Sequence, residues 1–380
     1  MSTEGSGSGI RRVLRGRGVR TAVVAGLVGA LLGAGVTAWS TGALDREAEA
    51  APCWGALREE TLTALFGEQR LRSEEQELTR GLGELTYGTC RVTGQRKHGI
   101  GHQLTVRVHE LDGLHGTDAH RWPGEFLTPD MTPLGKDLPG MASTERAWLA
   151  LPPSCTGRLR GTDAATVVDL AVGRAGRVRE GMRGTDAERR NALARAVVDT
   201  AGAVLRSFGC SASLPAPPGE LGHATVEDRA PGAPLCGVEG LRPPAAYRAE
   251  SSGGRVPLAW HRTNAADGPA RVCDAGTHVW EPQVKLTTVT HPGLVSVFSA
   301  STLRGGTRVT GSRGFGSVSA DRAAYRADCP SGPVVFLVEQ IRNVDGHPYD
   351  LTAALLPGYV AAEAERIGCG PLRIRVGAEG

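Results

Sequence analysis

The chain has 380 residues, of which 40% are hydrophobic, so it has room for two domains of ordinary size. Its formal net charge of +3 comes from the first twenty residues, which hold five arginines and one glutamate and leave 38 basic and 39 acidic residues beyond them. A near-neutral body offers no basic face to neutralise phosphates, so the composition excludes a nucleic-acid partner.

The N-terminal region predicts a membrane anchor. Residues 1–20 form a basic tail, and residues 21–44 are uncharged. As a helix, 24 residues rise about 36 Å, enough to cross a hydrocarbon core of roughly 30 Å. Arginines precede this segment, and Asp45, Glu47 and Glu49 follow it. We therefore expect a single-pass plasma-membrane protein with a cytoplasmic N-terminus and an extracellular C-terminus.

A cleaved signal peptide is the alternative interpretation of the same region. Residues 48–50 read Ala-Glu-Ala, an A-x-A site, so cleavage near Ala50 would release a secreted protein. The apolar stretch is longer than the 7 to 15 residues usual in signal peptides, which favours the anchor. In the anchored form, residues 45–52 would be a short stalk.

Residues 53–213 are expected to form the first extracytoplasmic domain. A short helix would follow Cys53 and end at Gly67, and alternating polarity predicts a half-buried strand over residues 102–109. Two more strands, 144–151 and 166–172, flank Cys155. The closing helix has a capping box that begins at Thr185 and an apolar stripe made by Leu193, Ala196, Val197, Ala201, Val204, Leu205 and Phe208.

Residues 214–235 contain five prolines and lack apolar periodicity, so they are expected to be a linker. Residues 236–380 would form the second domain. The segment His291-Pro292-Gly293 predicts a hairpin turn between strands 284–289 and 294–299. Further strands would flank Cys329 over residues 322–327 and 334–341. Pro357 suits the first turn of a closing helix that ends before Cys369.

The eight cysteines fall into two quartets with matching features. The first two cysteines of each quartet are 37 residues apart, and both fourth cysteines follow glycine. A Gly-x-x-Ser sequence begins fifteen residues before the third cysteine of each quartet. We therefore match Ser143 with Ser317 and interpret both serines as structural. These matches predict an internal duplication. If each copy closes its own disulfides, spacing favours the pairs Cys53–Cys90, Cys155–Cys210, Cys236–Cys273 and Cys329–Cys369.

Disulfides of this number predict an extracytoplasmic location. The competing use of cysteines as metal ligands requires short spacings such as C-x-x-C, and the sequence contains none. The expected fold class is α+β: an N-terminal transmembrane helix followed by two tandem disulfide-stapled domains. Each domain would be an antiparallel sheet packed with an opening and a closing helix.

The order of these features resembles a known group of proteins. An opening Pro-Cys with a short helix, a second cysteine before a strand pair, a Gly-x-x-Ser strand pair and a closing helix are similar to uncharacterised actinobacterial secreted proteins and lipoproteins, some with a PsbP-like α/β sandwich. The resemblance covers residues 53–210 and, more weakly, 236–369. It implies the sandwich fold and brings no catalytic residues. The chain departs from this group in having no lipobox, a duplicated domain and two added cysteines per copy.

Histidines are concentrated between residues 98 and 120, which raises the possibility of a metal site. Five of the ten lie there: His98, His102, His109, His115 and His120. The H-E-x-x-H motif is absent, and strand alternation places His102 and His109 on opposite faces. We interpret the segment as a polar, histidine-rich strand and loop, and keep His109, His115 and His120 as weak metal-ligand candidates.

The remaining motifs do not indicate catalysis. The sequence lacks G-x-S-x-G and the phosphate-binding G-x-x-x-x-G-K-[ST], so we expect no catalytic residue and no cofactor. The favoured function is a membrane-anchored protein with two non-catalytic domains that bind an unidentified envelope protein or ligand. The alternatives are a metal-dependent envelope enzyme that uses residues 98–120 and a structural subunit of an envelope complex. The sequence gives no indication of the oligomeric state.

Overall fold

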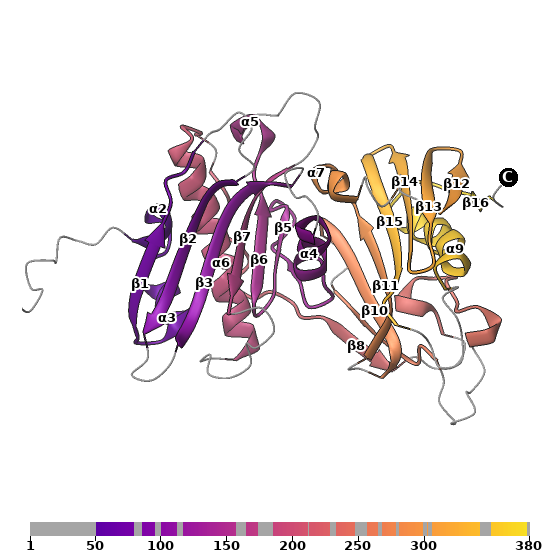
Figure 1. Ribbon diagram of the computed structural model, residues 1–380, viewed down its shortest axis with the longest axis horizontal. Helices are drawn as coiled ribbons and strands as arrows, with labels where there is room; N and C mark the ends of the chain where they lie inside the picture. The colour runs from indigo at the N-terminus through magenta and orange to yellow at the C-terminus, as the bar shows by residue number, and fades with distance from the viewer. Residues whose placement is uncertain are drawn as a thin grey trace, which may run out of the picture. The chain divides into compact units, whose positions relative to one another are not determined.

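The computed structural model describes residues 51–79, 86–95, 100–111, 117–156, 165–173, 185–211, 213–228, 233–247, 257–264, 268–278, 281–298, 302, 306–342 and 351–377. The expected tail and transmembrane helix lie outside these ranges. None of the helices within them combines the length and the apolar character that a membrane span requires. Residues Ala51 to Gly380 form one compact unit, and its class is α+β with two antiparallel sheets (Figure 1).

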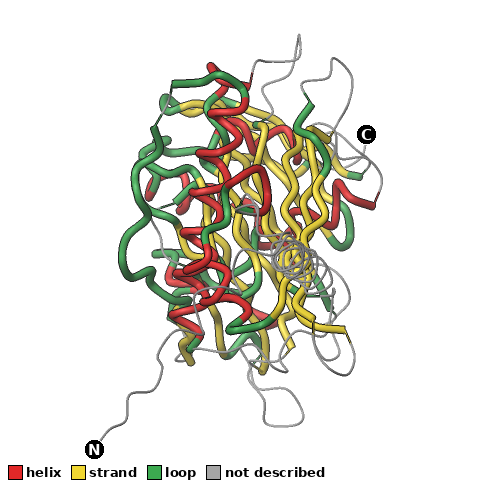
Figure 2. The backbone as a smooth tube through the Cα atoms, turned by 90° about the vertical axis from the view of Figure 1, so that its left-hand side faces the viewer, coloured by secondary structure: helices red, strands yellow, loops and turns green. Residues whose placement is uncertain are grey.

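The first sheet has seven strands in the order β1-β2-β3-β7-β6-β5-β4. Its strands are β1 (Arg70–Glu75), β2 (Thr86–Gln95), β3 (Ile100–Glu110), β4 (Thr132–Pro133), β5 (Gly140–Ala142), β6 (Arg146–Ala150) and β7 (Thr166–Val172). The associated helices are α2 (Pro52–Gly55), α3 (Glu59–Phe66), α4 (Thr117–Phe126), α5 (Pro153–Thr156) and α6 (Asp186–Ser207). Figure 2 shows long α6 running beside the strands.

The second sheet has nine strands in the order β16-β12-β13-β14-β15-β11-β10-β9-β8. Its strands are β8 (Thr225–Asp228), β9 (Trp260–Thr263), β10 (Ala270–His278), β11 (Glu281–Val289), β12 (Thr307–Gly311), β13 (Gly314–Val318), β14 (Arg322–Cys329), β15 (Gly332–Gln340) and β16 (Ile374–Val376). The helical elements are η3 (Leu235–Gly237), η4 (Ala245–Tyr247), α7 (Pro292–Val295), η5 (Ser296–Phe298) and α9 (Leu351–Arg366).

The two sheets share one strand order over seven positions. The order β1-β2-β3-β7-β6-β5-β4 matches β9-β10-β11-β15-β14-β13-β12, and every neighbouring pair is antiparallel. The β5–β6 and β13–β14 hairpins align Ser143 with Ser319, because each serine N–H donates to an arginine carbonyl three residues later, at 2.7 Å. The predicted match of Ser143 with Ser317, which was based on their equal distance from the third cysteine of each quartet, is therefore wrong by two residues.

Three apolar clusters form the core. One lies between the first sheet and helices α3 and α6, and a second lies between the second sheet and α9. The third contains buried side chains from both sheets, including Trp148, Val167, Val272 and Leu337. In β7 and β15, alternate residues belong to the helix-facing cluster and to this shared cluster, so the shared cluster lies on the opposite face of each sheet.

The structure contains the four disulfides whose pairing the spacing predicts. They join Cys53 to Cys90, Cys155 to Cys210, Cys236 to Cys273 and Cys329 to Cys369, with Cα–Cα distances of 5.3, 5.6, 5.9 and 4.9 Å. Each bridge closes within one sheet and its helices. The described residues include no free cysteine.

The Gly-Cys steps end α6 and α9 in the same way. Gly209 and Gly368 have φ angles of 70° and 74°, the left-handed conformation that glycine adopts without steric cost. The next N–H bonds back to a carbonyl five residues earlier, from Cys210 to Leu205 at 2.9 Å and from Cys369 to Ala364 at 2.8 Å. This six-to-one bond is the Schellman ending of a helix.

Several predicted elements are present within one or two residues of their expected limits. Strand 166–172 is β7, and the strand predicted over residues 102–109 is β3; burial alternates over residues 103–108, whereas His109 is buried although the alternation predicts the less buried face. The capping box of α6 has both reciprocal bonds, from Glu188 N–H to the Thr185 hydroxyl and from Thr185 N–H to the Glu188 carboxylate. Gly67 ends α3 at a φ of 68°.

Three local predictions differ from the structure. Residues 294–298 of the expected strand 294–299 are helical: Pro292 begins α7, and η5 follows, because proline at a first helical turn favours a helix over a hairpin turn. Pro357 lies inside α9, which includes residues from Leu351 onward. Within the expected linker, Leu221 is buried in the first core, and residues 225–228 form β8, the edge strand of the second sheet.

Candidate functional site

The histidine segment does not assemble a metal site in the described residues. No group of three His, Cys, Asp or Glu side chains is placed to hold a metal there. His109 is buried on β3, with its Nε2 2.6 Å from the Oδ2 of Asp169 on β7. His102 is half-buried on the same strand. His98, His115 and the side chain of His120 lie outside the described part.

Asp169 is the centre of a buried polar network on the shared face of the first sheet. The Arg107 guanidinium donates to both of its oxygens, at 3.0 and 3.1 Å, and the Trp122 indole N–H donates at 3.1 Å. Burial acts to raise the pKa of Asp169, but the neighbouring His109 and Arg107 outweigh it, so the pKa lies below its ordinary value. The network holds an ionised carboxylate in place.

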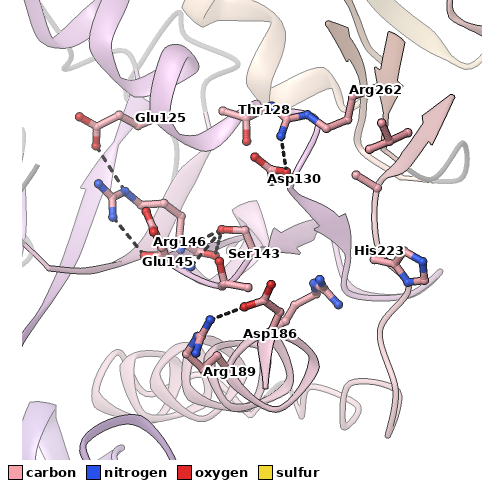
Figure 3. Close-up of a pocket in the computed structure, with 14 residues that line it drawn as sticks. Glu125, Thr128, Asp130, Ser143, Glu145, Arg146, Asp186, Arg189, His223 and Arg262 are labelled. Atoms are coloured by element: carbon pink, nitrogen blue, oxygen red, sulfur yellow. Dashed lines mark hydrogen bonds and ion pairs between the residues drawn. The ribbon is translucent and has the colours of Figure 1, made fainter. Parts of the chain in front are cut away.

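A charged pocket of about 600 Å³ is the stronger candidate for a site (Figure 3). The sequence segments that form it are far apart: the end of α4 and the loop after it, the β5–β6 turn, the first turns of α6, the segment before β8 with the start of β8, and β9. Its lining residues are Glu125, Thr128, Asp130, Ser143, Thr144, Glu145, Arg146, Asp186, Arg189, Arg190, His223, Ala224, Val226 and Arg262.

Three of the four arginines in the pocket have a carboxylate partner. The Arg262 guanidinium lies 3.0 Å from Asp130, and Arg146 lies 3.5 Å from Glu125. Arg189 pairs with Asp186 across one turn of α6. Figure 3 shows these three pairs at different sides of the pocket. Because each pair nearly cancels its own charge, they set the shape and polarity of the wall more than its net charge.

The Ser143 hydroxyl has a structural role in the turn. It accepts from the N–H groups of Glu145 and Arg146, at 3.3 and 3.0 Å. The Arg146 guanidinium donates to the carbonyls of Glu145 and Val172, both at 3.1 Å. These bonds fix the β5–β6 turn, and with it one wall of the pocket, in agreement with a structural interpretation of Ser143.

Arg190 differs from the other arginines of the pocket. It is 8% exposed, forms no ion pair with a described carboxylate, and its Nε has no hydrogen-bond partner among the described residues. Within the described part of the chain, one hydrogen bond engages its side chain, from a terminal nitrogen to the Leu221 carbonyl at 3.5 Å. Burial lowers the pKa of Arg190, while Asp186 and Asp130 act to raise it. An almost buried guanidinium with so few partners is costly in free energy.

The segment before β8 forms a second wall, which is fixed to α6 and to the first sheet. The Asn191 amide donates to the Gly219 carbonyl, and its oxygen accepts from the Leu221 N–H, both at 3.1 Å. The Thr132 hydroxyl donates to the Gly222 carbonyl at 2.9 Å. The side chains that follow, His223 and Val226, are exposed at the pocket.

Comparison with protein-family models, with curated proteins and with solved structures finds no match to this chain. The pocket therefore has to be interpreted from its own residues.

Among the pocket residues, Ser143 belongs to a sequence motif and the arginines belong to none. One signal was present for Arg190: it lies three residues before Leu193 and seven before Val197, on the apolar stripe of α6. An arginine at a stripe position is a charge directed toward the interior. The other pocket residues had no comparable signal, because tertiary contacts bring their segments together.

Proposed function

We propose that this chain is a membrane-anchored envelope protein whose extracytoplasmic part binds a small charged ligand in the pocket without converting it. The observation that carries the proposal is the pocket itself. It is of ligand size, and fixed ion pairs and turn hydrogen bonds hold its walls. Ion pairs and hydrogen bonds hold Ser143, Arg146, Arg189 and Arg262 in place, an arrangement suited to positioning a ligand.

The anchor by residues 21–44 and the extracellular location are part of the same proposal. The four disulfides support it, since such bonds persist in oxidising compartments. A test is to fuse a reporter that is active only outside the cytoplasm to the C-terminus. Activity is expected in the wild-type fusion and should be lost when residues 11–44 are deleted. An active cytoplasmic reporter at the same position would contradict the topology.

We further propose that residues 53–213 and 236–380 arose by duplication of a PsbP-like sandwich. The common strand order, the hairpin register that aligns Ser143 with Ser319 and the two equivalent helix endings support this origin. Gly140 and Gly316 provide a further match, because a side chain at either would collide with a carbonyl oxygen of the next strand, that of Trp148 or Ala324. The pocket residues Ser143 and Arg146 have counterparts in Ser319 and Arg322, but the pocket also needs His223, Val226 and Arg262 from outside residues 53–213, so we propose a single site and not one in each half.

The binding role is tested with a panel of small charged compounds: amino acids, carboxylates, phosphates and amines. We would measure the melting temperature of the full-length protein in detergent with each compound. At least one class should raise it, and the increase should vanish in Ala224→Trp, which fills the pocket. The matched control is Ala320→Trp, in the β13–β14 turn and outside the pocket lining. If no class shifts the melting temperature, or if the shift survives Ala224→Trp, the proposal fails.

A further inference from the structure

We propose that Arg190 is the anion-binding residue of this pocket and that the ligand carries a carboxylate or phosphate group. This inference rests on the binding role proposed above and adds the chemical class of the ligand. It follows from three properties of Arg190: its burial, the absence of an ion pair with any described carboxylate, and its rigid support.

The burial of Arg190 needs an explanation that the fold alone does not give. Arginine stays protonated in proteins, and its guanidinium has five N–H donors in a planar fork. In the described structure one weak bond at 3.5 Å engages this fork. Buried charges are normally paired, and a buried donor without an acceptor is destabilising. An oxyanion in the pocket would supply the missing acceptors.

The other charges of the pocket do not supply them. Glu125, Asp130 and Asp186 each form an ion pair with a different arginine. The fourth carboxylate, Glu145, forms no ion pair with a described residue, Arg190 included, and it lies on the β5–β6 turn. The two charged groups of the pocket that form no ion pair with a described residue are therefore the buried Arg190 guanidinium and the half-buried Glu145 carboxylate.

The guanidinium is also held where a ligand could meet it. Arg190 lies in the second turn of the 22-residue helix α6, whose start is fixed by the capping box. The neighbouring Asn191 fixes the Gly219–Leu221 wall by two hydrogen bonds. A planar fork on a rigid helix suits bidentate binding of carboxylate or phosphate oxygens, because little conformational freedom is lost on binding.

The test is isothermal titration of the full-length protein in detergent at constant ionic strength, with inorganic phosphate in one arm and succinate in the other. At least one anion should bind, and the arm that binds identifies the source of the oxyanion. Arg190→Leu should weaken its affinity at least tenfold. The matched control, Arg195→Leu, removes an exposed arginine of the same helix that lies outside the pocket lining, and it should change the affinity less than threefold.

Melting temperature separates a binding role from a structural one. Without anion, Arg190→Leu should melt at or above the wild-type temperature, because a poorly paired buried charge is replaced by an apolar side chain. With the bound anion, the wild type should gain stability and the variant should not. If Arg190→Leu does not fold, Arg190→Lys replaces it: losing the planar fork should weaken binding several-fold, and an unchanged affinity would overturn the inference.

Two further outcomes would overturn the assignment of Arg190. Binding of both anions could be absent, or their affinity could be unaffected by Arg190→Leu. If another compound class still gives a shift that Ala224→Trp removes, the anion class is wrong while the binding function stands. If no compound gives such a shift, both proposals fail.

Discussion

Two aspartates are buried in different sheets, and their surroundings affect their charges in opposite ways. Asp169 has hydrogen bonds with three residues, Arg107, His109 and Trp122, and the first two outweigh the effect of burial, so its pKa is lowered. The Oδ1 of Asp274 on β10 has no hydrogen-bond partner among the described residues, and its nearest ion pair is Arg262 at 3.8 Å. Burial therefore raises the pKa of Asp274. Near neutral pH, the Asp169 carboxylate is expected to stabilise the fold and the Asp274 carboxylate to destabilise it.

The paired substitutions Asp169→Asn and Asp274→Asn test this contrast. Because the pKa of Asp169 is lower in the folded state, its carboxylate stabilises the fold fully at pH values above the unfolded-state pKa of about 3.9. This stabilisation is lost as the pH falls from there through the folded-state pKa. Asp169→Asn should therefore cost about 3 kcal/mol near neutral pH, and less in acid, because it breaks a buried charged network. Urea denaturation near neutral pH and at about pH 3.5 measures both effects.

Asp274→Asn should behave in the opposite way. A raised folded-state pKa contributes stability below the unfolded-state pKa of about 3.9, and this contribution is lost as the pH rises through the folded-state value. The amide is neutral at every pH, so Asp274→Asn should be more stable than the wild type near neutral pH and equal to it in acid. A loss of stability at neutral pH would show that the ionised carboxylate has a partner that stabilises it.

At the scale of elements, helix α6 contains two glycines with different roles. Gly202 lies inside the helix, and an added methyl group would meet only the end of the Arg206 side chain at 3.5 Å. Gly209 lies just beyond the helix at a φ of 70°, with open space around its Cα. An alanine side chain would therefore collide with nothing at either position. The backbone conformation at each glycine sets the effect of its substitution on stability.

We expect Gly209→Ala to destabilise the protein by about 1 kcal/mol, since L-residues pay that amount in the left-handed conformation. Gly202→Ala, the control, should stabilise it by about 0.5–1 kcal/mol, because alanine is the better helix former. Thermal or urea unfolding of both variants provides the measurement. Equal effects of the same sign would mean that the Schellman ending does not set the conformation at Gly209.

At the scale of the whole molecule, the shared cluster should couple the two sheets. It contains buried residues from both, and the Ala165 N–H donates to the Gly293 carbonyl at 2.9 Å across the same contact. Each sheet also has its own core, so each half has apolar surface to bury by itself. We therefore expect the shared cluster to make the two halves unfold in one cooperative transition.

Leu337→Ala tests this coupling, because Leu337 belongs to the second sheet but packs in the shared cluster. It should cost about 2–5 kcal/mol, as for other buried leucines. The calorimetric transition should remain single, and amide exchange in β7 of the first sheet should accelerate as much as in β15. Two separate transitions, with exchange in β7 unchanged, would show that the halves unfold independently.

Features encoded locally could be predicted from the sequence. The capping box of α6, the alternation of β3, strand β7 and the glycine ends of helices depend on residues within a few positions of one another. The disulfide pairs could be predicted as well, because repeated spacing limited the choices. Short apolar runs were ambiguous: the sequence of residues 294–299 suited a strand as well as a helix, and the structure has α7, with Pro292 in its first turn, followed by η5.

The sequence by itself determined the α+β class, the disulfide framework and the ends of the main helices, because hydrophobic periodicity, capping and cysteine spacing act over short distances or in repeats. The tertiary structure decided the site. Arg146, Arg190 and Arg262 come from strand β6, helix α6 and strand β9, which span more than a hundred residues, and Arg262 reaches Asp130 because the two sheets pack together. No regular spacing in the sequence predicts which charged residues form ion pairs. Arg190 could therefore be identified as an arginine with no ion pair to a described carboxylate only from the tertiary structure.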